Sequence, residues 1–292
     1  MSAPPGYCHR MLRRGAIALR AMALLVAAGW LGSAPALAWG PTAHRLAISQ
    51  AVDTLPAEMR YFFEANRQLL VEHANDPDQW LQKDPYERKQ HYIYLDKYGI
   101  FPYVDLPHSF KLAQEKFGSR RINRDGLLPW HVGEYSLRLT TALKVQKWEE
   151  AKLLAAALGY YVADTRDPLH TTANYDGQLT GQTGLGTRFG ATLIDRFQGF
   201  MMFRPAPAAK IDDPTEYAFE AVLEANTWVS QIVLADRQAL QGLHDYNEDY
   251  LDRFYSAIGP TVARELNNAA HDIGAYWYTA WVNAGRPQLP GR

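Results

Sequence analysis

Hydrophobic positions repeat with the period of an α-helix over most of the chain. In the stretch 41–52, for example, Leu46, Ala47, Ile48 and Ala51 fall on one face. A further run begins at Lys152 and should stop at Asp167-Pro168, because proline disfavours a helical conformation in the residue before it. We expect helices over 41–52, 56–71, 107–117, 126–147, 152–166, 214–240 and 257–284.

The composition of this helical region is uniform. Hydrophobic residues make up 47% of the chain, which indicates a globular protein with a substantial core. No linker and no shift in composition divides the region. We therefore expect residues 39–292 to form a single all-α, multi-helix domain.

Residues 1–38 have a different pattern. Four arginines precede an apolar run at 21–30, and the small residues of Ala36-Leu37-Ala38 follow it. This order is typical of a secretory signal peptide cleaved after Ala38, and the run is too short to span a membrane. We expect an exported protein, periplasmic or extracellular, with no transmembrane segment in the mature chain.

Removal of this peptide changes the charge. It takes away four arginines and no acidic residue, which leaves 26 basic against 31 acidic residues, a formal charge of −5. A mildly acidic protein is poorly suited to non-specific attraction to nucleic-acid backbones, so we expect no stable nucleic-acid partner. The only cysteine, Cys8, is also removed, so the mature chain would contain neither a thiol nor a disulfide.

The most informative polar residues lie where the helix beginning at Lys152 should end. Asp164 falls near its C-terminus among apolar neighbours, and His170 follows just after the break. A buried carboxylate is costly unless it is paired or bound to a cation. Taken alone, this stretch favours a helix end with a paired Asp and a surface His.

A longer motif favours a metal site instead. Residues 158–178 read Leu-Gly-Tyr-Tyr-Val-Ala-Asp-Thr-Arg-Asp-Pro-Leu-His-Thr-Thr-Ala-Asn-Tyr-Asp-Gly-Gln. This segment resembles the core motif of the zinc-dependent phospholipase C family, which is related to the single-strand-specific zinc nucleases. Tyr160 stands where the family has His, and the resemblance extends from Trp39 to the region of Phe197. It implies an all-α fold of this family's type, a zinc centre and hydrolysis of phosphodiesters.

The resemblance assigns a ligand role to the predicted mature N-terminus. In the family an N-terminal Trp binds zinc through its α-amine and carbonyl, with a nearby His as partner. Cleavage after Ala38 would give Trp39 and His44 these roles. An α-amine titrates at about 7.7–8.0, so zinc can displace its proton readily.

A second pair of implied ligands precedes the core motif. Asp84-Pro85-Tyr86-Glu87 and the following His91 resemble the family segment Asp…Asp-Pro-x-Glu-x-x-x-His-Tyr-Ile-Asp, whose first Asp and His bind zinc. Spacing favours Asp78 as that Asp, with Asp76 as the alternative. Together with the core motif, the implied ligands are Trp39, His44, Asp78 (or Asp76), His91, Asp164 and His170, of which Asp78 and Asp164 are also the implied catalytic residues.

Three ligand positions of the family are replaced in this chain. They are Tyr160 and, where the family has Gly-x-His-x-x-Phe-Glu, Gly186 and Gly190. One zinc position keeps three ligands in Trp39, His44 and Asp164, and a second keeps Asp78, His91 and Asp164; the third keeps His170 alone. Since catalytic zinc normally has three protein ligands plus water, we expect one or two zinc ions.

We therefore expect a secreted phosphodiester hydrolase of the phospholipase C type with a two-zinc site, acting on substrates such as phospholipid head groups. A zinc pair bridged by Asp164 would generate hydroxide near neutral pH. Loss of the third ion should impair phosphate binding unless Arg166 or Arg188 supplies the charge. Two alternatives remain: a catalytically degenerate relative that binds a phosphate ester or a partner, and a zinc-dependent nuclease.

Overall fold

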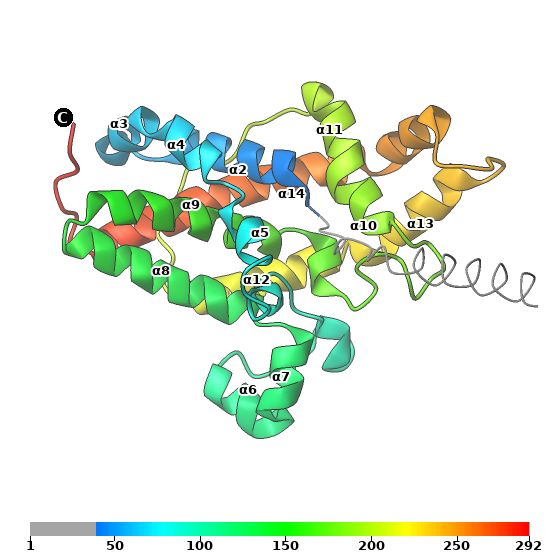
Figure 1. Ribbon diagram of the computed structural model, residues 1–292, viewed down its shortest axis with the longest axis horizontal. Helices are drawn as coiled ribbons and strands as arrows, with labels where there is room; N and C mark the ends of the chain where they lie inside the picture. The colour runs from blue at the N-terminus through cyan, green and yellow to red at the C-terminus, as the bar shows by residue number, and fades with distance from the viewer. Residues whose placement is uncertain (1–38, 292) are drawn as a thin grey trace, which may run out of the picture. The chain divides into compact units, whose positions relative to one another are not determined.

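A long C-terminal helix organises the structure. The computed structural model describes residues 39–291, and all regular elements in that range are helical (Figure 1). Helix α14 (Glu248–Asn283) packs against α2 (Pro41–Thr54), α8 (Leu128–Lys144) and α9 (Trp148–Thr165). This arrangement confirms an all-α fold in one compact domain.

The predicted helices are present, but two of them begin earlier than the hydrophobic repeat indicates. α9 starts at Trp148, directly after Lys147. α14 starts nine residues before the predicted position because the side chain of Asn247 caps it, accepting a hydrogen bond from the backbone N–H of Tyr250. As predicted, α9 ends at Thr165, ahead of Pro168.

Two predicted helices are each divided in two. The stretch 56–71 forms α3 (Ala57–Ala65) and α4 (Arg67–Glu72), which are separated at Asn66. The stretch 214–240 forms α12 (Pro214–Asn226) and α13 (Val229–Leu240). The apolar repeat continues across both breaks, so the pattern alone predicts one helix in each case.

The remaining elements are short. In Figure 1, α6 and α7 form a lobe at the lower edge of the helical bundle. The segment Arg188–Thr192 is a π-helical turn, a form that is rare in proteins and found frequently at functional sites. The short elements in chain order are α5 (Asp76–Trp80), η1 (Glu87–Gln90), η2 (Leu95–Lys97), α6 (Phe110–Phe117), α7 (Ser119–Asp125), η3 (Pro168–Thr171), α10 (Leu185–Thr187), η4 (Arg188–Thr192), α11 (Leu193–Phe197) and η5 (Gln198–Phe200).

Close approach of α2 to α9 and α14 fixes the position of the first helix. A Cβ atom added at Gly159 on α9 would lie 2.9 Å from Ile48 Cγ1, and one added at Gly274 on α14 would lie 1.9 Å from Thr54 Oγ1. Glycine at these two points therefore allows the helices to come within contact of α2. The same packing brings the N-terminal part of α2 beside the C-terminal part of α9.

The predicted signal peptide lies outside the described residues. Its cleavage after Ala38, and the export that follows from it, stay predictions. Within residues 39–291, no helix is long and apolar enough to cross a membrane.

Candidate metal centre

Asp164 is surrounded by three histidines from three separate parts of the chain. It lies in the last turn of α9 and is fully buried. Its Oδ1 atom lies 3.0 Å from His44 Nε2 and 3.3 Å from His170 Nδ1. Its Oδ2 atom lies 3.2 Å from His91 Nδ1. The structure therefore brings together four of the residues that the sequence indicates as zinc ligands.

Each histidine is held by local backbone structure. His44 lies on the first turn of α2, where its Nδ1 is 3.3 Å from the carbonyl oxygen of Gly40, so that Nε2 faces Asp164. His170 lies on η3 and is buried, so the surface position that the stretch around Asp164 suggests when taken alone is wrong. The backbone N–H of Ile93 donates to the His170 carbonyl (2.9 Å), which ties the irregular segment after His91 to η3.

Asp78 reaches the same cluster through Tyr160. The Tyr160 hydroxyl donates to Asp78 Oδ1 at 2.6 Å, and the Tyr160 ring stacks on the His44 ring with centroids 3.9 Å apart. The alternative, Asp76, instead contacts His73 Nδ1 at 2.7 Å. The structure thus places Asp78, rather than Asp76, beside the cluster.

Trp39 and Gly190 lie at the same end of the bundle. Trp39 is fully buried, and its ring meets the His44 ring edge to face with centroids 6.5 Å apart. The backbone N–H of Gly40 donates to the Gly190 carbonyl at 2.8 Å, joining the start of α2 to the π-helical turn. Gly186 lies on the short helix α10, and its N–H donates to Asp176 Oδ1 at 3.2 Å.

Glu87 also belongs to the cluster, although the resemblance implies no role for it. Its Oε1 atom lies 3.3 Å from His91 Nε2 and accepts a hydrogen bond from the Tyr161 hydroxyl. The signal for this contact is present in the sequence, because Glu87 precedes His91 by four residues on a helical turn.

The charges of the cluster are mutually dependent. Burial disfavours the charged form of every member, but the imidazoles, led by His170, outweigh it and hold the pKa of Asp164 well below its usual range. Burial lowers the pKa of His91, but the nearby carboxylates of Asp164 and Glu87 outweigh it and raise this pKa to about 9. Burial raises the pKa of the neighbouring Asp167 carboxyl to about 6.

The donor atoms are of the types that bind zinc, and each histidine nitrogen lies at a distance from Asp164 that two ligands of one zinc ion would have. Zinc bonds of about 2.0–2.1 Å at a tetrahedral angle separate two ligand atoms by about 3.3 Å, and the His–Asp164 separations are 3.0, 3.2 and 3.3 Å. His170 Nδ1 and His91 Nε2 are buried and lie 3.3 Å from Asp164 Oδ1 and from Glu87 Oε1, respectively, without the geometry of a hydrogen bond. Buried polar atoms of this kind are normally paired.

The same atoms are not arranged to hold a metal as they stand. Within residues 39–291, no group of three or more His, Cys, Asp or Glu side chains has the geometry of a metal site. The reason is that His44 and His91 each direct a ring nitrogen at an oxygen of Asp164. Zinc binding would have to displace the protons shared between these ring nitrogens and Asp164. Affinity for the metal would therefore fall as pH falls.

The two arginines considered as replacements for the third ion are committed elsewhere. Arg166 pairs with Asp272 and Glu224. Arg188 pairs with Asp236 and donates to backbone carbonyls of the preceding loop. Both guanidinium groups therefore hold the fold together, and neither is available to a phosphate at the Asp164 cluster.

Comparison with known proteins gives no family assignment. No protein-family model matches the chain, and no curated protein matches it. Inferences about function therefore depend on the residues around Asp164.

Proposed function

We propose that the chain is a zinc-dependent phosphodiester hydrolase with a reduced site built on Asp164. The observation that carries the proposal is the division of this carboxylate: Oδ1 faces His44 and His170, while Oδ2 faces His91. A carboxylate whose two oxygens face different sets of nitrogen donors has the form required to bridge two metal ions. Zinc is the ion that imidazole and carboxylate donors suit in a hydrolytic site.

The residues would divide the work as follows. His44, with the N-terminal part of the chain at Trp39, would hold one ion, while His91 and Asp78 would hold the other; Asp164 would bridge them. Bound zinc would supply a water of lowered pKa and a positive charge for the phosphate. Asp78 Oδ1 accepts a hydrogen bond from the Tyr160 hydroxyl. Released from that bond, its carboxylate would accept a proton from water.

The first prediction concerns Asp164. Asp164→Asn keeps the side-chain shape but removes the charge that both ions would share. We expect zinc content, measured by elemental analysis of the mature protein, to fall, with an affinity loss of at least about tenfold. Hydrolysis of bis(4-nitrophenyl) phosphate should be lost with it. The matched control is His244→Gln, which removes an exposed imidazole that takes no part in these contacts.

The outcome that would overturn the proposal is a variant that keeps both zinc and hydrolysis. Comparison of 4-nitrophenyl phosphorylcholine with single-stranded DNA as substrates would then separate a phospholipase activity from a nuclease activity in the active protein.

A second candidate is a zinc-binding relative without turnover. Two observations favour this candidate. His44 and Asp164 are both fully buried, and the Tyr160 hydroxyl donates a hydrogen bond to Asp78. A wild-type protein that binds zinc through Asp164 but does not hydrolyse either phosphodiester would support this candidate over the first.

A further inference from the structure

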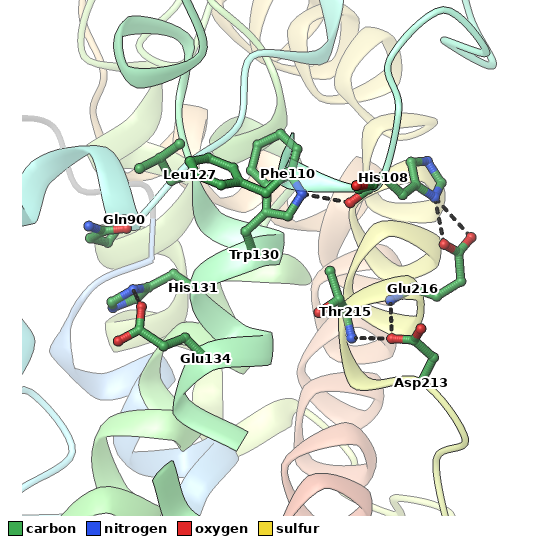
Figure 2. A pocket seen from close by; sticks show the side chains of 11 residues that line it. Gln90, His108, Phe110, Leu127, Trp130, His131, Glu134, Asp213, Thr215 and Glu216 are labelled. Carbon is green, nitrogen blue, oxygen red and sulfur yellow. Dashed lines mark hydrogen bonds and ion pairs between the residues drawn. The ribbon is translucent and has the colours of Figure 1, made fainter. Parts of the chain in front are cut away.

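A cavity lies between α8 and α12, and its lining includes Gln90, the neighbour of His91 in sequence, and His131, whose ring meets that of Tyr161 edge to face. Its volume is about 560 Å³, and Figure 2 shows it bounded by the first turns of both helices and by the segment that carries His108 and Phe110. This volume suits a small organic molecule, for which binding sites typically measure about 300–1,000 Å³. Of the described residues that line it, none is an implied zinc ligand.

Aromatic side chains form one wall of the cavity. The rings of Trp130 and Phe110 meet edge to face with centroids 5.4 Å apart, and Trp130 also contacts Phe219 at 5.1 Å. The indole Nε1–H of Trp130 donates to the His108 carbonyl at 2.6 Å, which fixes the orientation of the ring. The wall is therefore already positioned to stack on an apolar or aromatic group.

Carboxylates line the opposite part of the cavity. Asp213 caps α12 by accepting from the N–H groups of Thr215 and Glu216, and the Glu216 carboxylate pairs with His108 Nδ1 at 2.8 Å. Glu134 on α8 has no such partner within hydrogen-bond distance and is 61% exposed. Neither Lys nor Arg occurs among the described residues that line the cavity.

His131 provides an unpaired polar group in the same wall. Its side chain is only 10% exposed, and Nε2 is buried without a hydrogen-bond partner. Nδ1 lies 3.7 Å from the Glu134 carboxylate, too far for a hydrogen bond. Figure 2 shows the ring lying between Gln90 and Glu134. Burial lowers the pKa of His131 to about 4, so at neutral pH it adds no charge to offset the carboxylates.

We infer that this cavity binds an organic ammonium ion that carries an aromatic or other apolar group. The apolar group stacks on Trp130 and Phe110, and the ammonium group lies near Glu134. Aromatic faces attract cations, and the carboxylates exclude phosphates and carboxylates from the same space. The ligand is thus opposite in charge to the substrate proposed for the Asp164 cluster, which makes this a second site with its own ligand class.

The experiment compares two probes of equal shape, 2-phenylethylammonium and the neutral 2-phenylethanol, by calorimetry and ligand-observed NMR on the mature protein. We expect saturable binding of the ammonium, at least about tenfold tighter than that of the alcohol, a difference of 1.4 kcal/mol. Binding should persist after treatment with a chelator. Equal affinity for the two probes, or loss of binding on chelation, would overturn the inference.

Variants locate the site. Glu134→Gln should weaken ammonium binding about tenfold and leave the alcohol unaffected, since it removes only the charge. Glu72→Gln removes one exposed carboxylate elsewhere and should change nothing. Trp130→Leu should weaken both probes. If Glu134→Gln binds the ammonium as the wild type does, the cation lies somewhere else and the assignment is wrong.

Discussion

Tyr160 is one of the three positions at which the candidate metal centre differs from the complete site that the resemblance implies. Where the resemblance to the zinc-dependent phospholipase C family would place a His, this chain has a phenol that is fully buried, stacks on His44 and donates to Asp78. Burial and the carboxylates of Asp164 and Asp78 raise its pKa well above the usual value, so the group stays a neutral hydrogen-bond donor. Tyr160 therefore holds the carboxylate of one proposed ligand, Asp78, in a hydrogen bond. As a neutral phenol it adds no zinc ligand of its own.

We therefore expect Tyr160→His to increase zinc affinity at the position formed by Asp78, His91 and Asp164. A fourth donor should raise affinity by about tenfold or more, measured by competition with a chelator of known affinity. Tyr160→Phe is the matched control, because it frees Asp78 without adding a donor. If both variants gain zinc equally, release of Asp78 accounts for the effect and the added imidazole does not bind.

Glu265 is a buried carboxyl away from the cluster. It lies on α14 with no exposed surface, and its Oε2 atom has no hydrogen-bond partner. Burial raises its pKa to about 7, although the charge of Arg166 nearby opposes the shift. The folded protein therefore binds this proton more tightly than the unfolded chain, whose Glu residues titrate near 4.3.

The sign of the effect on stability follows from that difference. Between about pH 4.5 and 7 the folded state holds the proton that the unfolded state has lost, so the contribution of Glu265 to stability falls as pH rises. We expect Glu265→Gln to raise the free energy of unfolding by about 1–3 kcal/mol at pH 8 and by little at pH 5. Urea denaturation at both pH values, with the exposed Glu220→Gln as control, measures this. A stabilisation equal at both values would show that Glu265 does not titrate as described.

At the scale of elements, the hydrophobic repeat predicts where helices form better than where they end. The breaks at Asn66 and between α12 and α13 interrupt runs that remain apolar, so packing rather than sequence period decides them. The early start of α14 depends on one capping side chain, Asn247. The π-helical turn at Arg188–Thr192 has no recognisable signal in the sequence.

Contact between α2 and α14 is tightest at Gly274. A methyl group there would overlap Thr54 Oγ1 and approach the Ala51 carbonyl to 3.2 Å. We expect Gly274→Ala to lower the free energy of unfolding by about 1–3 kcal/mol, as measured by urea denaturation. Gly199→Ala, where a Cβ meets nothing within 4 Å, should be neutral.

A second variant tests the cause. Because the overlap is mainly with the Thr54 hydroxyl, Gly274→Ala should cost less in a Thr54→Ala background, and the two changes should not be additive. Additive effects would mean that the helix backbones themselves, and not this side chain, limit the approach.

At the scale of the whole molecule, motif spacing predicts which residues meet but not how they are bonded. His44, Asp78, His91, Asp164 and His170 converge as the sequence indicates. The contacts of Glu87, the commitment of Arg166 and Arg188 to ion pairs, and the cavity beside Trp130 depend on side chains from distant helices. Such pairings leave no periodic trace along one chain, so sequence alone does not reveal them.

The packing of α2 against α14 also sets the order in which the molecule can be completed. Thr54 and Gly274 meet across more than two hundred residues, so the packing of α2 is completed only once α14 has been synthesised. Closing so long a loop costs entropy before any contact repays it. Until then the apolar faces of α2, α8 and α9 that α14 covers stay open to water. The nascent chain therefore keeps part of its core unfinished until α14 has been synthesised.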